Sequence, residues 1–270
     1  MMIKSRFGLW SIAVAGLLAI GCGDEQAGGT GGTGGTGGTG GTGGSAPGMA
    51  MVRVAHLAPD VPSMADTNVD ILVDGATAIE DLQFAEATGF VELPAGTYTF
   101  GIAVAGSTEP VFEFEATLSD GQIATVVAIR TVVDSGGAAP VNVLVFDGST
   151  DGLETGSGRV LAGHGADDSS LSEVDVIATD ACPPALIDGF LFGTVRGPLN
   201  LPAGEYNIGI AAVGSCSPAA GPLVAPVTAD LVTLLIAVDN DTADEALAPA
   251  VYALVGDFSG NDIPTLQAAP

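Results

Sequence analysis

One stretch of the chain occurs twice, 108 residues apart, and this duplication constrains the fold more than any other feature. Residues 84–107 read FAEATGFVELPAGTYTFGIAVAGS and residues 192–215 read FGTVRGPLNLPAGEYNIGIAAVGS, so that twelve of the 24 aligned positions are identical. A solenoid is built from much shorter repeats, of about 20–50 residues, whereas this spacing suits a duplicated domain. The sequence therefore predicts two related domains.

The boundaries of the two copies follow from composition and from matching residues outside the duplicated stretch. Arg53 of the first copy answers Arg159 of the second, and Thr125 answers Thr233. A polar, glycine-rich segment separates the copies and predicts a linker. We expect domains at residues 50–147 and 159–258, a linker at 148–158 and a C-terminal tail at 259–270.

Alternation of apolar and polar side chains predicts that each copy is built from strands. Val69, Ile71 and Val73 share one face of an extended segment, whereas Asp70 and Asp74 lie on the other face. The Asp-Gly step that follows is a hairpin turn signal.

A second turn, Leu-Pro-Ala-Gly at 93–96, precedes a strand whose apolar side chains point one way: Tyr98, Phe100, Ile102 and Val104 in the first copy, and Tyr206, Ile208, Ile210 and Ala212 in the second. Residues 123–129 are apolar on both faces, as expected for a central, covered strand. Further strands are expected at 111–118, 122–130 and 141–146, and no segment after the N-terminal region has a helical pattern. Six to eight short strands in about 100 residues favour an all-β fold, with two tandem immunoglobulin-like β-sandwich domains.

Three segments of the first copy resemble the DUF4397 family: VRVAHLAPD at 52–60, VDILVDG at 69–75 and LPAGTY at 93–98. The resemblance covers residues 51–147 and, more weakly, 159–257, where AGHGADD at 162–168 replaces the opening segment and the Asp-Gly turn is missing. It implies an extracytoplasmic bacterial protein with tandem β-sandwich domains. It implies no catalytic residues, because the family has no established activity.

The N-terminal residues predict export and lipid attachment. Lys4 and Arg6 precede an uncharged, mostly apolar run of 14 residues at 7–20, which is short for a membrane span but suits a secretory signal. The run ends in LAIGC at 18–22, which resembles the cleavage site of bacterial lipoproteins. We expect a signal peptide at 1–21 and a lipid on Cys22; the alternative is an ordinary signal peptide with a chance cysteine.

Residues 22–49 contain five Gly-Gly-Thr triplets and predict a flexible, disordered tether. Such a segment has few side chains to pack and much backbone entropy to lose on folding. We expect it to hold the domains away from the membrane.

Charge limits the partners that the protein can bind. The chain has 32 acidic and six basic residues, and its formal net charge is −26. A surface of this charge repels the phosphate backbone of nucleic acids, so no nucleic-acid partner is expected. A neutral ligand, a cationic partner or a divalent cation remains compatible with the composition.

Cys182 and Cys216 occur only in the second copy, where the loop around Cys182 has about three extra residues. Two thiols in an oxidising compartment usually pair. We expect a disulfide that fastens the enlarged loop to the end of the strand before Cys216.

Each copy has a histidine followed four residues later by an aspartate: His56 with Asp60, and His164 with Asp168. Such a pair can act in acid–base or metal chemistry. It also suits a structural histidine at the end of a strand, next to an aspartate that fixes a turn. We favour the structural interpretation, because one His and one Asp are too few ligands for a structural zinc site.

The densest acidic segment supplies the weak calcium candidates Asp239, Asp241, Asp244 and Glu245. Their oxygen ligands suit Ca²⁺, but the glycine and spacing of a calcium-binding helix–loop–helix are missing. A solvated loop is favoured, and no cofactor is expected.

The sequence thus predicts a non-catalytic binding or structural module, held at the cell envelope by a lipid on Cys22 and directed at an unknown envelope or extracellular ligand. The competing hypothesis is a hydrolase or metal-dependent enzyme that uses the repeated His/Asp pairs.

Overall fold

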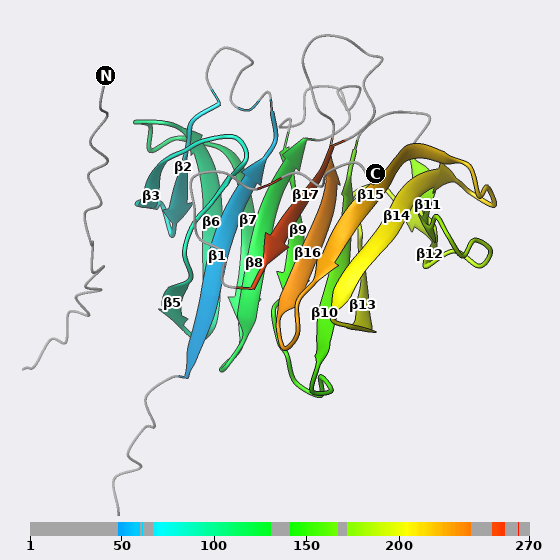
Figure 1. Cartoon of the computed structure of the whole chain (residues 1–270). Helices are drawn as coiled ribbons and strands as arrows, with labels where there is room; N and C mark the ends of the chain where they lie inside the picture. The colour runs from blue at the N-terminus through cyan, green and yellow to red at the C-terminus, as the bar shows by residue number, and fades with distance from the viewer. Residues whose placement is uncertain are drawn as a thin grey trace, which may run out of the picture. The chain divides into compact units, whose positions relative to one another are not determined.

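A computed structural model describes residues 48–59, 61, 67–130, 141–166, 172–238, 250–256 and 264. All of them fall within the second of the two units into which contacts divide the chain, Met1–Ala46 and Pro47–Pro270. In these residues every regular element is a β-strand (Figure 1), which confirms the all-β prediction.

The first repeat contributes nine strands: β1 (Met49–Leu57), β2 (Val69–Val73), β3 (Ala76–Leu82), β4 (Glu86–Ala87), β5 (Val91–Pro94), β6 (Gly96–Val104), β7 (Pro110–Leu118), β8 (Ile123–Arg130) and β9 (Val141–Asp147). The second contributes eight: β10 (Ser157–Gly165), β11 (Glu173–Ala178), β12 (Ile187–Leu191), β13 (Val195–Pro202), β14 (Gly204–Ala212), β15 (Pro218–Val227), β16 (Val232–Val238) and β17 (Ala250–Val255). The strands expected at 111–118, 122–130 and 141–146 are therefore confirmed within one residue at each end.

The two repeats share one topology. In the first, a sheet of order β4-β1-β8-β9, with β5 also paired to β1, faces a sheet of order β3-β2-β6-β7. In the second, β13-β10-β16-β17 faces β12-β11-β14-β15. All pairings are antiparallel except β1 with β8 and β10 with β16. Each repeat is thus a sandwich of two sheets, and the immunoglobulin-like detail stays a prediction.

The recurrent Leu-Pro-Ala-Gly-x-Tyr segment forms the corner where the chain passes from one sheet to the other. The hydroxyl group of Tyr98 donates a 2.8 Å hydrogen bond to the carbonyl oxygen of Pro94, and Tyr206 does the same to Pro202. A tyrosine whose hydroxyl returns to the backbone a few residues upstream fixes such corners in β-sandwiches. This role explains why the segment is among the best preserved of the duplication.

The two sandwiches share a hydrophobic core. Side chains of β1, β8 and β9 pack against side chains of β10, β16 and β17 in one cluster, whose fully buried members include Leu57, Val127, Ile129, Ile236 and Leu254. The predicted central strand at 123–129 is therefore covered on one face by its own sandwich and on the other by the second repeat. Figure 1 shows the sheets of the two repeats next to each other.

Two glycines of β10 allow this close approach. A Cβ atom at Gly163 would lie 2.6 Å from Cζ of Phe146, and one at Gly165 would lie 2.8 Å from Cγ2 of Ile129. Any larger residue at these positions would force the two sheets apart. The residues between β9 and β10 are held as well, because Arg159 donates hydrogen bonds to the carbonyl oxygens of Ser149 and Asp151.

The register of the strands corrects the expected match between Arg53 and Arg159. His56 and His164 occupy equivalent places, but His56 is three positions after Arg53, whereas His164 is five positions after Arg159. Leu161 is therefore the counterpart of Arg53. The match was wrong because it relied on two identical Arg-Val steps, although the arginine of the second repeat stands two positions earlier in its strand.

The match of Thr125 with Thr233 is also wrong, because β16 is shifted by one residue relative to the 108-residue offset of the repeat, so that Leu234 takes the place of Thr125. Thr125 lies opposite Arg53 and accepts a 2.8 Å hydrogen bond from its Nε, whereas Leu161 lies opposite Leu234. The second repeat thus replaces a buried polar pair with two leucines. The Arg53 side chain is buried, and its guanidinium lies 4.8 Å above the centre of the Phe90 ring.

Candidate functional site

His56 is a buried strand residue whose ring is held by the backbone. Its Nε2 lies 2.9 Å from the carbonyl oxygen of Thr67 and 3.2 Å from that of Val61, and the N–H of Ala58 points to Nδ1 at 3.5 Å. Burial lowers the pKa of His56, against the smaller raising effect of the two carbonyl oxygens. A neutral ring with its N–H directed to these carbonyls joins the end of β1 to the segment that follows it.

His164 is buried at the equivalent place in β10 and lies among aromatic rings. Its ring centre is 5.5 Å from that of Phe190 and 6.0 Å from that of Phe192. The aspartates paired with the histidines in the sequence, Asp60 and Asp168, lie outside the described residues.

Two buried aspartates, which sequence reasoning did not single out, hold equivalent loops in the two repeats. Asp70 accepts hydrogen bonds from the N–H groups of Asp81 and Gly106, at 2.9 and 2.8 Å. Asp175 accepts them from Gly189 and Gly214, at 2.9 and 2.7 Å.

The repetition of Val-Asp at 69–70 and 174–175 was the signal that could have revealed this role. Hydrogen bonds from the N–H groups of Gly189 and Gly214 lower the pKa of Asp175, and they outweigh the raising effect of its burial. Both carboxylates therefore have a structural role: each accepts hydrogen bonds from the backbone N–H groups of two turns.

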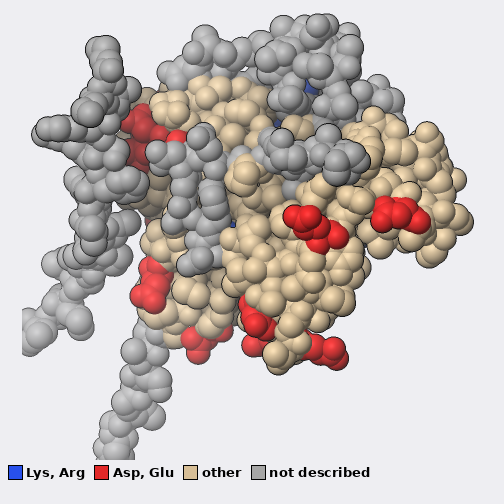
Figure 2. Space-filling model, viewed as in Figure 1, with Lys and Arg blue, Asp and Glu red and all other residues tan. Residues whose placement is uncertain are grey.

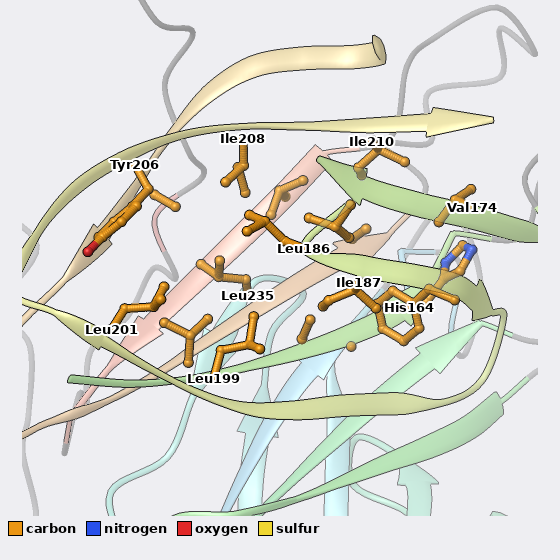
Figure 3. Close-up of a pocket in the computed structure, with 18 of the residues that line it drawn as sticks. His164, Val174, Leu186, Ile187, Leu199, Leu201, Tyr206, Ile208, Ile210 and Leu235 are labelled. Atoms are coloured by element: carbon orange, nitrogen blue, oxygen red, sulfur yellow. The ribbon is translucent and has the colours of Figure 1, made fainter. Parts of the chain in front are cut away.

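The second sandwich contains an apolar cavity between its two sheets (Figure 3). Its volume is about 60 Å³, and its wall is almost entirely hydrocarbon. Side chains from both sheets line it, among them Val174, Leu186, Leu199, Ile208, Ile210 and Leu235.

The cavity has one exposed margin and one aromatic neighbour with a fixed hydroxyl group. Leu186, in the connection from β11 to β12, lines the cavity and is 36% exposed, so this side chain extends from the cavity wall to the surface. Tyr206 contributes its ring, while its hydroxyl is held by Pro202. His164 lies at one end of the cavity in Figure 3.

Smaller side chains in the second repeat explain the cavity. The equivalent space in the first sandwich has a volume of about 10 Å³. There, Phe100 lies opposite Phe114 with ring centres 5.4 Å apart, and Ile102 lies opposite Phe112. The second repeat has non-aromatic residues at the three phenylalanine positions: Ile208, Leu223 and Ala220.

An unfilled cavity of this size destabilises the fold. At about 24 cal/mol per Å³, the 60 Å³ correspond to about 1.4 kcal/mol. The second repeat therefore has a lower free energy of unfolding than it would have with a filled core, whereas phenylalanine side chains fill the equivalent space in the first repeat.

The predicted disulfide between Cys182 and Cys216 is confirmed. It joins the β11–β12 connection to the β14–β15 connection, with the two Cα atoms 5.7 Å apart. Gly209 of β14 leaves room for both connections, since a Cβ atom there would be 2.8 Å from Cβ of Pro218 and 3.2 Å from Cγ2 of Thr179. The connection that carries Cys182 also carries Leu186, so the disulfide restrains the segment at the margin of the cavity.

Several predicted sites fall outside the described residues. They are the signal peptide at 1–21, the lipid acceptor Cys22, most of the tether at 22–49 and the calcium candidates Asp239, Asp241, Asp244 and Glu245. Within the part of the chain that the structure describes, no group of three or more His, Cys, Asp or Glu side chains is placed to hold a metal ion. The same residues contain no helix with the length and apolarity that crossing a membrane requires.

Comparison with known proteins identifies a domain but no activity. Residues 50–177 match the domain of unknown function DUF4397, so the chain contains a DUF4397 domain. The match extends from β1 through the first repeat into β11. No curated protein matches the chain.

Proposed function

We propose that this DUF4397-containing chain is an exported, lipid-anchored, non-catalytic binding module whose second sandwich receives an apolar group between its sheets. The first sandwich then serves as a filled structural partner. The cavity of about 60 Å³, present in one repeat and nearly closed in the other, is the observation that carries the proposal.

The chemistry of the cavity wall supports an apolar ligand. Apolar cavities of protein interiors stay dry and bind hydrocarbon guests, because a guest restores the dispersion contacts that the wall lacks. A polar ligand would lose its hydrogen bonds to water at a wall that offers almost no polar surface. The limited volume suits the end of a hydrocarbon chain, with the remainder of the ligand at the exposed margin beside Leu186.

Location at the cell envelope is supported by two independent features of the chain. Residues 18–22 resemble a lipoprotein cleavage site, and the disulfide Cys182–Cys216 is typical of an oxidising compartment. A protein held beside a membrane by Cys22 would meet lipids and their single-chain derivatives at high local concentration. A medium-chain monoacylglycerol, which is neutral and so avoids repulsion by the acidic side chains on the surface (Figure 2), is the simplest probe.

Calorimetric titration of the purified chain with a medium-chain monoacylglycerol tests the proposal. The native chain should give saturable heat with a negative heat-capacity change, the mark of apolar burial. Ile208→Phe, which introduces the phenylalanine of the first repeat into the cavity, should remove the heat. Val213→Phe is the matched control, because this valine of the same repeat is 52% exposed, and it should bind like the native chain.

Equal binding by the native chain and Ile208→Phe would place the ligand elsewhere and overturn the assignment of the cavity. An absence of saturable heat with the native chain would overturn the apolar ligand itself.

A further inference from the structure

Strand β7 forms an open edge of the first sandwich. It has nine residues and, in the described part of the chain, pairs only with β6. The pairing is regular from Gly96 opposite Leu118 to Ile102 opposite Phe112. In an antiparallel strand, alternate residues direct their N–H and C=O groups away from the neighbour, so β7 presents a row of backbone groups to a possible additional strand.

The equivalent edge of the second sandwich is blocked. Strand β15 contains Pro218, Pro222 and Pro226, none of which has a backbone N–H, and its register with β14 shifts twice. Proline and irregular register are two of the ways in which proteins protect an edge strand from pairing. In β7 the sole proline is Pro110, the first residue of the strand. The two repeats therefore differ at their edges as they differ in their cores.

The side chains of β7 alternate strictly. Phe112 and Phe114 are partly buried and pack towards the core of the sandwich, whereas Glu113 and Glu115 are exposed on the outer face of the sheet. A strand added beside β7 would place every second side chain next to these two carboxylates. Opposite charges at such positions stabilise a strand pair, and like charges destabilise it.

This pattern disfavours a second copy of the chain as the occupant. Two β7 strands paired antiparallel about Phe114 would set Glu113 of each copy opposite Glu115 of the other. Four carboxylates would then face one another on one side of the sheet, on molecules that already carry a formal net charge of −26.

We propose that the edge of β7 accepts an extended basic segment of a partner protein by strand addition. The segment would have lysine or arginine at alternate positions, beside Glu113 and Glu115, and apolar or β-branched residues between them, beside Phe112 and Phe114. Backbone hydrogen bonds to β7 would hold the segment, and the alternating cations would select it. This site belongs to the first sandwich and does not depend on the cavity of the second.

The test uses a synthetic peptide of alternating lysine and valine, titrated into the full chain and followed by amide NMR signals. Binding should shift the amide signals of β7 and weaken as salt is added. Glu113→Lys with Glu115→Lys should lower the affinity by roughly tenfold or more, since two favourable cross-strand pairs become unfavourable. Glu80→Lys, an exposed glutamate of β3 at the other edge of the same sheet, is the matched control and should change the affinity little.

Two N-methylated forms of the peptide separate strand addition from mere attraction between charges. Methylation along the peptide edge that faces β7 should abolish binding, and methylation along the opposite edge should leave it intact, with no change to the protein. Equal binding of both forms, or shifts centred away from β7, would overturn the proposal. Formation of a dimer by the chain through β7 would overturn the choice of partner.

Discussion

Replacing Ile208 by phenylalanine should stabilise the protein, although most substitutions in a packed core destabilise. The two repeats differ by about 50 Å³ in the volume left between their sheets, about 60 against about 10 Å³. At about 24 cal/mol per Å³, filling that difference raises the free energy of unfolding by up to about 1.2 kcal/mol. The reciprocal change, Phe100→Ile in the first repeat, should lower it by about 1–2 kcal/mol through lost apolar contacts.

Urea unfolding followed by circular dichroism measures both changes. With a slope of about 2–3 kcal/mol per M, Ile208→Phe should raise the midpoint by about 0.5 M at unchanged slope. A fall of the free energy of unfolding by an amount typical of overpacking, about 1–3 kcal/mol, would mean that no space exists beside Ile208 and would refute the reasoning from cavity volume. Val213→Phe should leave the free energy of unfolding within about 0.5 kcal/mol of the native value.

Three further predictions concern the groups that hold the second repeat and the strand ends. Cys182→Ser with Cys216→Ser should lower the free energy of unfolding by about 3–4 kcal/mol, because the unfolded chain loses its cross-link; an unchanged urea midpoint would contradict this. Burial lowers the pKa of His56 below its ordinary value of 6.5. The stability that the neutral ring contributes should therefore be complete above pH 6.5 and should be lost as the pH falls towards the folded-state pKa. The slope should be at most about 1.4 kcal/mol per pH unit. Urea midpoints at several pH values measure this slope, and the same slope in His56→Gln would show that another group causes it. Asp175→Asn should cost about 1–3 kcal/mol, since the carboxylate accepts two backbone N–H bonds and the amide presents a donor to one of them; Asp230→Asn, at an exposed position of the same repeat, is the control, and equal losses in the two variants would exclude a special role for Asp175.

The local structure was predictable because it depends on short-range signals. Alternating apolar and polar side chains predicted the strands, and the Asp-Gly step at 74–75 predicted a turn, in which both residues have positive φ. The presence of two cysteines in one copy predicted the disulfide. Each of these signals acts within a few residues or depends on residue type alone.

The shared core could not be read from the sequence. Residues 123–129 are apolar on both faces, which indicates that both faces of the strand are covered. The pattern does not indicate which part of the chain covers the second face. That layer is the sheet of β10, β16 and β17, and Gly163 and Gly165 show how it approaches. The all-β fold was predicted correctly, but the core shared by the two repeats was missed.

The cavity was missed for a related reason. The changes from Phe100 to Ile208 and from Phe112 to Ala220 look conservative position by position, because every residue stays apolar. Only the register of β14 with β15 shows that Ile208 and Ala220 lie near each other, and of the two it is Ile208 that lines the cavity. A cavity depends on the volumes of side chains that meet in space, whereas a sequence pattern shows only which residues along the chain are polar or apolar.

Placement of a bound hydrocarbon chain by NMR tests the central claim most directly. A medium-chain monoacylglycerol bound to the full chain should show contacts from its terminal methyl group to the methyl groups of Ile210 and Leu235, which line the cavity of the second sandwich. It should show none to Ile102 and Val126, which line the nearly closed space of the first. Equal contacts to both pairs, or contacts only to surface methyl groups such as those of Val145, would contradict the assignment of ligand binding to the second sandwich.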